Sequence, residues 1–219
     1  LSGAHTTPAA ELSWPEGALW QHGQKLATIG PALPGSHHAE HAAAAFAMSD
    51  FLGVPTQAIQ AGLSSFPGLP HRQKIVAEQN GIIFVDDSKA TNADAAARAL
   101  GCYDKLVWIA GGMAKEGGIA SLVPYFTRIA HTVLIGRDAA QLAQTLAAHN
   151  APYSIVDTLE RAVPAAFAQA QQSGARVVLL SPACASFDQF SGFEARGLRF
   201  AELAHALAPQ NGTQTGKIG

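Results

Sequence analysis

Short apolar strands alternate with longer helices through residues 82–207, and this alternation restricts the fold more than any other feature of the chain. The expected strands are nearly all apolar, which is typical of a parallel sheet covered on both faces. Strands and helices alternate in this way in doubly wound α/β domains. We therefore predict that fold, with strands at 82–86, 106–110, 132–135, 153–156 and 177–180 and helices at 93–100, 120–129, 139–149, 159–172 and 194–207.

The mostly parallel sheet is expected to begin with a β-hairpin. Residues 73–78 and 82–86 flank Asn80-Gly81. Asn-Gly between two apolar runs is the strongest short signal for a two-residue hairpin turn. The sequence therefore predicts an antiparallel strand pair at the start of this domain.

The chain before the sheet has a different pattern. Residues 18–22 and 24–29 flank Gly23 and predict a small hairpin, and helices are expected at 40–52 and 56–63. Residues 1–16 are expected to be irregular, and the polar residues from 209 onward to be a disordered tail. The turn residues at 64–70 mark the best boundary. We divide the chain into residues 1–66, 67–208 and 209–219.

Composition excludes several classes of protein. Of the 219 residues 48% are hydrophobic and only 14% charged, and the net charge of −2 indicates no nucleic-acid or membrane-surface partner. No apolar run approaches the roughly 20 residues that span a bilayer, and no signal peptide is visible. Two cysteines, Cys102 and Cys184, make no disulfide framework, so we expect a reduced, cytoplasmic protein. We also expect a monomer. The first residue is Leu1, which is compatible with a piece of a longer chain.

Polar residues follow the strand at 82–86 directly. The segment Asp86-Asp87-Ser88-Lys89-Ala90-Thr91-Asn92 leads into a helix whose N-cap is Thr91 or Asn92. Ligands bind outside the carboxyl ends of strands in open α/β sheets, and helix N-termini attract anions. The alternative is that the two carboxylates only solvate the strand end, with Lys89 paired to one of them.

Two further loops are expected at the same edge of the sheet. Residues 111–118 follow the second strand and place Lys115 between glycine pairs, and residues 181–190 follow the last strand. An ammonium beside exposed backbone N–H groups suits a carboxylate or a phosphate. The alternatives are a tight turn with a solvated Lys115, and nucleophilic chemistry at Cys184 or a serine. Cys184 lies between alanines, which favours a small buried residue.

Four other patterns are weaker evidence of function. Gly111-Gly112 lacks the spacing of a dinucleotide fingerprint, and residues 212–218 only superficially resemble a P-loop. His37 and His41 have the i, i+4 spacing of metal ligands, but a third ligand would have to come from elsewhere, and we predict no metal site. Arg72, at the domain boundary, could clamp a nucleotide together with Asp87 or form an interdomain salt bridge.

The motifs together resemble one family. They occur in this order: Gly68-Leu69-Pro70-His71-Arg72, Asp87-Ser88-Lys89-Ala90-Thr91-Asn92, Gly111-Gly112-x-x-Lys115, Leu180-Ser181-Pro182-Ala183-Cys184-Ala185-Ser186-Phe187-Asp188-Gln189-Phe190 and Phe193-Glu194-x-Arg196-Gly197. The series resembles the C-terminal region of the Mur ligases, and among them the members that add D-glutamate. The resemblance is strong from Phe66 to about Leu207 and weaker from Pro34 to Leu63.

The resemblance implies a fold and a reaction. Residues 1–66 would be the helical tail end of the central ATPase domain, and residues 67–208 a Rossmann-like domain that brings D-glutamate. The complete enzyme uses ATP and Mg²⁺ to activate UDP-N-acetylmuramoyl-L-alanine as an acyl phosphate, which the amine of D-glutamate attacks to give a tetrahedral intermediate, in peptidoglycan biosynthesis. No tightly bound cofactor is expected in this chain, and we expect the chain alone to be inactive, because we find no P-loop in it.

The resemblance also implies roles for single residues. By motif position, D-glutamate would be bound by Thr91, Lys115, Ser186, Phe187 and Phe193. ATP would be bound by Arg72, Asp87, Lys89 and His38. No residue of this chain is assigned a catalytic role, because the third domain acts by positioning its substrate.

One motif departs from the family pattern. Gly-x-His-Asn-x-x-Asn appears here as Gly35-Ser36-His37-His38-Ala39-Glu40-His41, so that His38 and His41 replace both asparagines. Imidazole can donate, accept or stack, but its charge varies near neutral pH.

Two other interpretations of the function stay open: a Mur ligase with a different acceptor, and a non-catalytic module of the same fold that binds an amino acid or docks to a partner.

Overall fold

The computed structural model describes residues 12–13, 18–21, 24–28, 30 and 36–207. The expectations for residues 1–11 and for the tail from 209 to 219 lie outside the described residues. Within the segment expected to be irregular, Leu12–Ser13 form a short strand, β1, that pairs with β2. This part of the prediction was wrong, because a two-residue strand is too short to show a period in the sequence.

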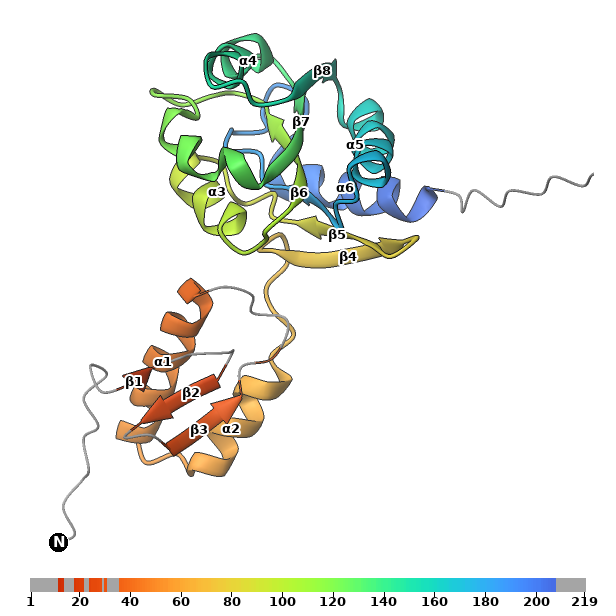
Figure 1. The fold of residues 1–219 in the computed structure, drawn as a ribbon. Coiled ribbons are helices and arrows are strands. Elements are labelled where there is room, and N and C mark those ends of the chain that lie inside the picture. The colour runs from red at the N-terminus through yellow and green to blue at the C-terminus, as the bar shows by residue number, and fades with distance from the viewer. Residues whose placement is uncertain (1–11, 14–17, 22–23, 29, 31–35, 208–219) are drawn as a thin grey trace, which may run out of the picture.

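The C-terminal part is a doubly wound α/β domain, as predicted (Figure 1). Its six-stranded sheet has the order β4-β5-β9-β6-β7-β8, in which only β4 runs antiparallel to its neighbour. The strands are β4 (Lys74–Gln79), β5 (Ile82–Asp86), β6 (Leu106–Gly111), β7 (Ile129–Ile135), β8 (Tyr153–Asp157) and β9 (Val177–Leu180).

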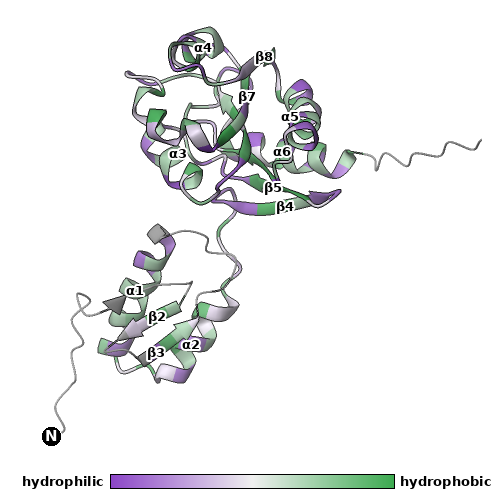
Figure 2. Ribbon diagram, viewed as in Figure 1, coloured by the Kyte–Doolittle hydropathy of each residue, from purple (hydrophilic) through white to green (hydrophobic). Residues whose placement is uncertain are grey.

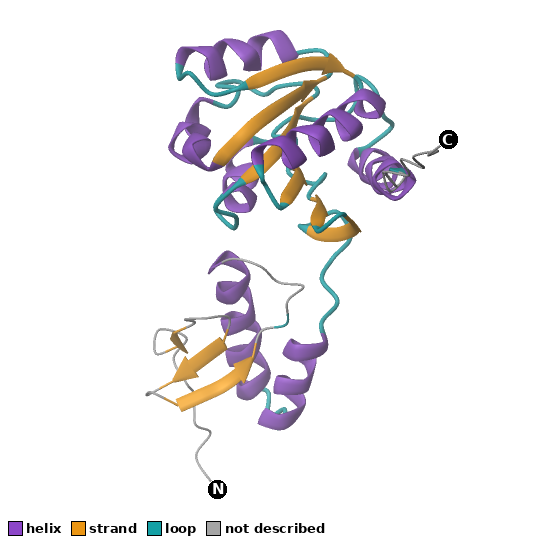
Figure 3. Ribbon diagram, turned by 45° about the vertical axis from the view of Figure 1, so that its right-hand side comes forward, coloured by secondary structure: helices purple, strands orange, loops and turns teal. Residues whose placement is uncertain are grey.

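Helices cover both faces of this sheet (Figure 3). One hydrophobic core joins the sheet to α3 (Ala93–Leu100), the 3₁₀ helix η3 (Ala120–Arg128) and α4 (Ala139–Ala148). The other core joins it to α5 (Leu159–Ser173) and α6 (Phe193–Ala206). Because both faces are covered, β6 and β9 are buried along their whole length, which explains their unbroken apolar sequences. Figure 2 shows the same concentration of hydrophobic residues along β5.

Two predictions of local structure have different outcomes. The β4–β5 hairpin is confirmed: Asn80 and Gly81 both have positive φ, 52° and 73°, as a type I′ turn requires. The α-helix expected at 120–129 is instead a 3₁₀ helix. Pro124 in its middle has no N–H for an α-helical hydrogen bond, and its ring would clash with the carbonyl group four residues earlier.

The N-terminal part is a separate small unit. Strands β2 (Ala18–Gln21) and β3 (Gln24–Thr28) form the predicted hairpin beside α1 (Ser36–Phe51) and α2 (Thr56–Ser65), and α1 begins four residues earlier than predicted. Its small core is formed by Leu19, Ala27, Ala39, Ala42, Ala43, Phe46 and Ile59. An extended segment after α2 leads to the α/β domain (Figure 1). Among the described residues, no helix has the length and apolar character needed to cross a membrane.

Candidate functional site

Three loops meet at one edge of the sheet. Because β5, β9 and β6 are parallel neighbours, the segments that follow them lie side by side. The last two are joined directly: Met113 and Ala185 exchange backbone hydrogen bonds of 2.8 and 3.0 Å. Gly112, at φ 126°, makes this contact possible, because a Cβ there would overlap the carbonyl oxygen of Ala185. Gly112 is therefore required for the approach of the two loops.

A buried arginine ties all three loops together. Arg196 on α6 is 1% exposed, and its guanidinium donates to the Ser88 hydroxyl (2.9 Å) and to three backbone carbonyls. These are the carbonyls of Ser88 (2.9 Å), Cys184 (3.1 Å) and Gly111 (3.5 Å). One carbonyl lies on each loop. Burial lowers the pKa of Arg196 to about 10, which leaves the group charged at neutral pH.

The first loop carries a buried carboxyl group, Asp87. Its Oδ2 accepts a hydrogen bond of 2.7 Å from the hydroxyl of Ser181, the residue after β9. Burial raises the pKa of Asp87 from 3.8 to about 7, and the neighbouring Asp86 adds to the rise. The Ser181 hydroxyl, the Gln73 backbone and the charge of Arg72 oppose it. Asp87 therefore changes its protonation state near neutral pH.

The raised pKa predicts a dependence of stability on pH. A carboxyl group whose pKa is higher in the folded than in the unfolded chain stabilises the protein fully below pH 3.8, and this contribution is lost as the pH rises to about 7. Asparagine has no charge to bury, so we expect the stability of Asp87→Asn relative to wild type to increase by about 2–3 kcal/mol from pH 5 to pH 8. Urea unfolding at both pH values measures this. A difference that does not change with pH would contradict the assignment.

The preceding residue, Asp86, forms a contact that sequence reasoning missed. Its Oδ1 accepts a 2.9 Å hydrogen bond from the Ser88 N–H, and its Oδ2 lies 2.7 Å from His71 Nδ1. Both partners are shielded, with 3% and 12% of the side chains of Asp86 and His71 exposed. In the sequence, His71 belongs to the motif Gly68-Leu69-Pro70-His71-Arg72, but no pattern predicts a role for it.

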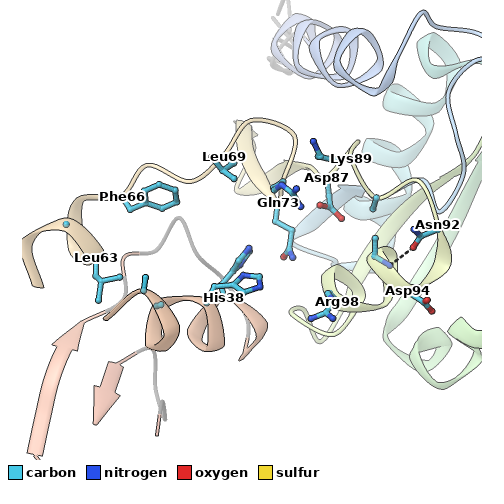
Figure 4. A pocket seen from close by; sticks show the side chains of 17 residues that line it. His38, Leu63, Phe66, Leu69, Gln73, Asp87, Lys89, Asn92, Asp94 and Arg98 are labelled. Atoms are coloured by element: carbon cyan, nitrogen blue, oxygen red, sulfur yellow. Dashed lines mark hydrogen bonds between the residues drawn. The ribbon is translucent and has the colours of Figure 1, made fainter. Parts of the chain in front are cut away.

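A cavity of about 850 Å³ lies between α1, α2 and the first loop. This volume is within the range of pockets that hold small molecules. In Figure 4, His38 on α1 lies across the cavity from Gln73 and Arg98. Apart from His38 and His41, apolar residues and Gly62 line the N-terminal side. The polar residues on the other side include Asn92, which caps α3 by accepting from the Ala95 N–H at 2.9 Å.

The structure brings the four predicted nucleotide-binding residues together. Arg72, Asp87, Lys89 and His38 all line this one cavity, although they come from three separate segments of the chain. His41 lines it too, with its ring centroid 6.1 Å from that of His38. The side chain of His37 lies outside the described residues, so its proposed spacing with His41 is not described. No group of three or more potential metal ligands occurs among the described side chains.

The five residues predicted to bind the acceptor lie outside the residues that line the cavity. Lys115 is exposed and Thr91 half-buried, while Ser186 is 2% exposed and Phe187 is 69% exposed. Lys115, Ser186 and Phe187 lie on the two loops that the Met113–Ala185 bridge joins. Phe193 connects this group to the cavity, since the Lys89 ammonium lies 4.5 Å from the centre of its ring.

The alternative of a cysteine nucleophile has no support. Cys184 is fully buried, and burial raises the pKa of its thiol to about 12. Burial likewise raises the pKa of Cys102 to about 11. The thiolate is the nucleophilic form, so neither thiol is activated at neutral pH.

The fold is that of a doubly wound α/β domain, a class in which ligands bind at this edge of the sheet. Comparison with known protein families is more specific: the model described as "Mur ligase, glutamate ligase domain" matches residues 71–184, just over half of the chain. The chain belongs to the Mur ligase family.

Curated relatives share this assignment. The chain is 55% identical over 177 residues to the UDP-N-acetylmuramoylalanine–D-glutamate ligase of Rhizobium johnstonii, which covers 80% of this chain and 37% of the relative. The ligases of Rhodospirillum rubrum (53% identical; 80% and 37% covered) and Cereibacter sphaeroides strain ATCC 17029 (46%; 87% and 41%) are also similar. The chain thus spans about two fifths of the length of these relatives.

Solved structures support the fold. A UDP-N-acetylmuramate–alanine ligase from Thermotoga maritima superposes with a TM-score of 0.59 at 16% identity, covering 84% of this chain and 41% of that one. MurF from Acinetobacter baumannii gives a TM-score of 0.55 at 19% identity, with 88% and 44% covered. At these identities the similarity establishes the architecture alone.

Proposed function

We propose that this chain is the acceptor-binding portion of an ATP-dependent ligase that joins D-glutamate to UDP-N-acetylmuramoyl-L-alanine in peptidoglycan biosynthesis. The observation that carries the proposal is the joint placement of Arg72, Asp87, Lys89 and His38 around one cavity beside three converging loops. Relatives at 46–55% identity have this activity in their names. A cytoplasmic location and a monomeric state are part of the proposal.

The proposal includes a division of the chain. Residues 1–66 would belong to the central ATP-binding domain and residues 67–208 to the domain that binds D-glutamate. The hydrophobic cores support this division, because the small core of α1, α2 and the β2–β3 hairpin shares no residue with the two cores of the α/β domain.

Arg72, Asp87 and Lys89 would hold ATP from the side of the α/β domain. Arg72 and Lys89 supply positive charge for phosphate oxygens, and Asp87 can bond a ribose hydroxyl in either protonation state. His38 would face the base from α1. When bound together with Mg²⁺, ATP would supply the phosphoryl group that activates the carboxylate of the nucleotide sugar. The residues of this chain bind and orient both reactants.

D-glutamate would lie along the Met113–Ala185 bridge. A dianionic amino acid requires cationic and hydrogen-bonding groups, and the two joined loops offer the Lys115 ammonium, the Ser186 hydroxyl and the Phe187 backbone. Thr91 and the ring of Phe193 would complete the site. The amine of D-glutamate would then attack the acyl phosphate to give a tetrahedral intermediate, and this intermediate would lose phosphate.

Loss of the Lys115 ammonium should weaken acceptor binding strongly. Hydrogen bonds to charged groups contribute about 1.5–3 kcal/mol, so Lys115→Ala is expected to raise the Kd for D-glutamate roughly tenfold to a hundredfold. Titrations of the labelled chain followed by NMR measure this. Lys105→Ala is the matched control, because Lys105 precedes β6 and lies at the opposite edge of the sheet. Equal Kd values for both variants would contradict the assignment.

A chimera tests the complete function. Residues 67–207 of this chain would replace the corresponding segment of the Rhizobium johnstonii ligase, and phosphate release would be measured with ATP, UDP-N-acetylmuramoyl-L-alanine and one amino acid at a time. The proposal predicts turnover with D-glutamate and not with L-glutamate or diaminopimelate. Turnover with another acceptor would establish a different Mur ligase. Binding of D-glutamate without turnover would favour a non-catalytic module.

A further inference from the structure

The turn His71-Arg72-Gln73 has an unusual backbone. His71 and Gln73 have φ angles of 60° and 50°, in the left-handed region that residues with a Cβ rarely adopt. Each such residue costs about 1–2 kcal/mol relative to an ordinary conformation. Two of them on either side of Arg72 persist only if surrounding contacts hold them.

The contacts that hold the turn come from the loop after β5. The His71 ring is bonded to Asp86 at 2.7 Å, and the His71 carbonyl accepts from the Lys89 N–H at 3.1 Å. Gln73 is buried, with 5% of the residue exposed, and its backbone bonds the Asp87 carboxyl group. Each flank of Arg72 is therefore fixed to the segment that carries Asp87 and Lys89.

Helix α6 encloses the His71–Asp86 pair. Gly197 packs against both side chains, because a Cβ at this position would overlap His71 Nδ1 and approach Asp86 Oδ2. The ring of Phe193, one turn earlier, meets the His71 ring edge to face, with centroids 5.9 Å apart. The pair is shielded from water by a helix that has no side chain at the point of contact.

We propose that His71 and Asp86 are positioning residues that act through Arg72. By fixing the turn to the sheet edge, the pair would place Arg72 beside Asp87 and Lys89 at the cavity before a ligand binds, so that a nucleotide polyphosphate meets a preformed cationic set. This inference deepens the proposed function and rests on it for the identity of the ligand. If the pair fixes this turn to the sheet, Arg72 belongs to the α/β domain. Any bending between the N-terminal unit and the α/β domain then occurs at residues that precede His71 in the chain.

The test compares His71→Ala with His71→Asn in the full chain. Asparagine tolerates positive φ and can donate to Asp86, whereas alanine does neither. The control is His205→Ala, an exposed histidine near the end of α6. Backbone ¹⁵N relaxation reports the order of residues 71–73 without a ligand. We expect order parameters there to fall from about 0.85 to about 0.6 in His71→Ala and to recover in His71→Asn, while β6 and β9 keep their values.

Titration with ADP and with adenosine provides the second readout. His71→Ala should raise the Kd for ADP about tenfold and change the Kd for adenosine less than twofold, because only phosphate binding depends on Arg72. Unchanged order at 71–73, or equal losses for ADP and adenosine, would overturn the positioning role. A wild-type chain that does not bind ADP, with the turn still loosened in His71→Ala, would instead count against the nucleotide site of the proposed function.

Discussion

Replacement of Arg196 by methionine is expected to lower the free energy of unfolding by about 3–5 kcal/mol. Methionine fills similar space but leaves the carbonyls of Ser88, Cys184 and Gly111 without their shared donor. A buried polar group left unsatisfied costs about 1–3 kcal/mol. The expected loss is smaller than the sum of these costs for three carbonyls, because the variant no longer buries a charge. The lowered pKa of Arg196 reflects the cost of burying that charge.

Arg199→Met on the same helix is the matched control for this effect. Arg199 forms ion pairs with Glu160 and Glu202 at 3.0 Å, but all three side chains are at least 42% exposed. Such surface pairs contribute about 0–1 kcal/mol, so the control should unfold close to wild type in urea. Similar losses in both variants would show that Arg196 does not hold the three loops together.

Replacement of Gly112 by alanine should be at least as damaging, with a loss above about 3 kcal/mol or no folded protein. The added Cβ would overlap the Ala185 carbonyl oxygen, and φ of 126° is accessible to glycine almost exclusively. The Met113–Ala185 bridge would have to open, which separates the loops that carry Lys115 and Ser186.

Gly117→Ala in the same loop separates steric overlap from backbone strain. Gly117 also has a positive φ, 81°, but no atom lies within 4 Å of a Cβ built there. Its replacement should cost about 1–2 kcal/mol, the strain alone. Thermal unfolding of the two variants measures the difference. If Gly112→Ala were no less stable than Gly117→Ala, the close approach of the loops would not be required for the fold.

The features predicted correctly from sequence are those with local causes. The apolar run before Asp86 and the Asn80-Gly81 turn each determine their own structure within a few residues, so β5 and its hairpin were placed correctly. The alternation of strands and helices in the sequence indicated a parallel sheet, and therefore three loops at the edge formed by the carboxyl ends of its strands. It carried no information on strand order, which depends on how the helices pack after the strands have formed.

Contacts between distant residues were not predictable in the same way. The His71–Asp86 bond joins residues 15 positions apart, and Arg196 reaches back 108 positions to Ser88. One signal for Arg196 was present: with Phe200 and Ala204 it occupies every fourth position of α6, the face that the structure buries. A charged residue at an apolar position of a helix indicates a buried partner. No comparable pattern pointed to His71.

The most direct test of the central claim is an NMR titration of the labelled chain with D-glutamate, with L-glutamate as control. The proposal predicts shifts at Thr91, Lys115, Ser186 and Phe187 with the D isomer, and a much weaker response to the L isomer. Equal responses to both isomers would contradict a stereospecific acceptor site and indicate a general anion site at the sheet edge.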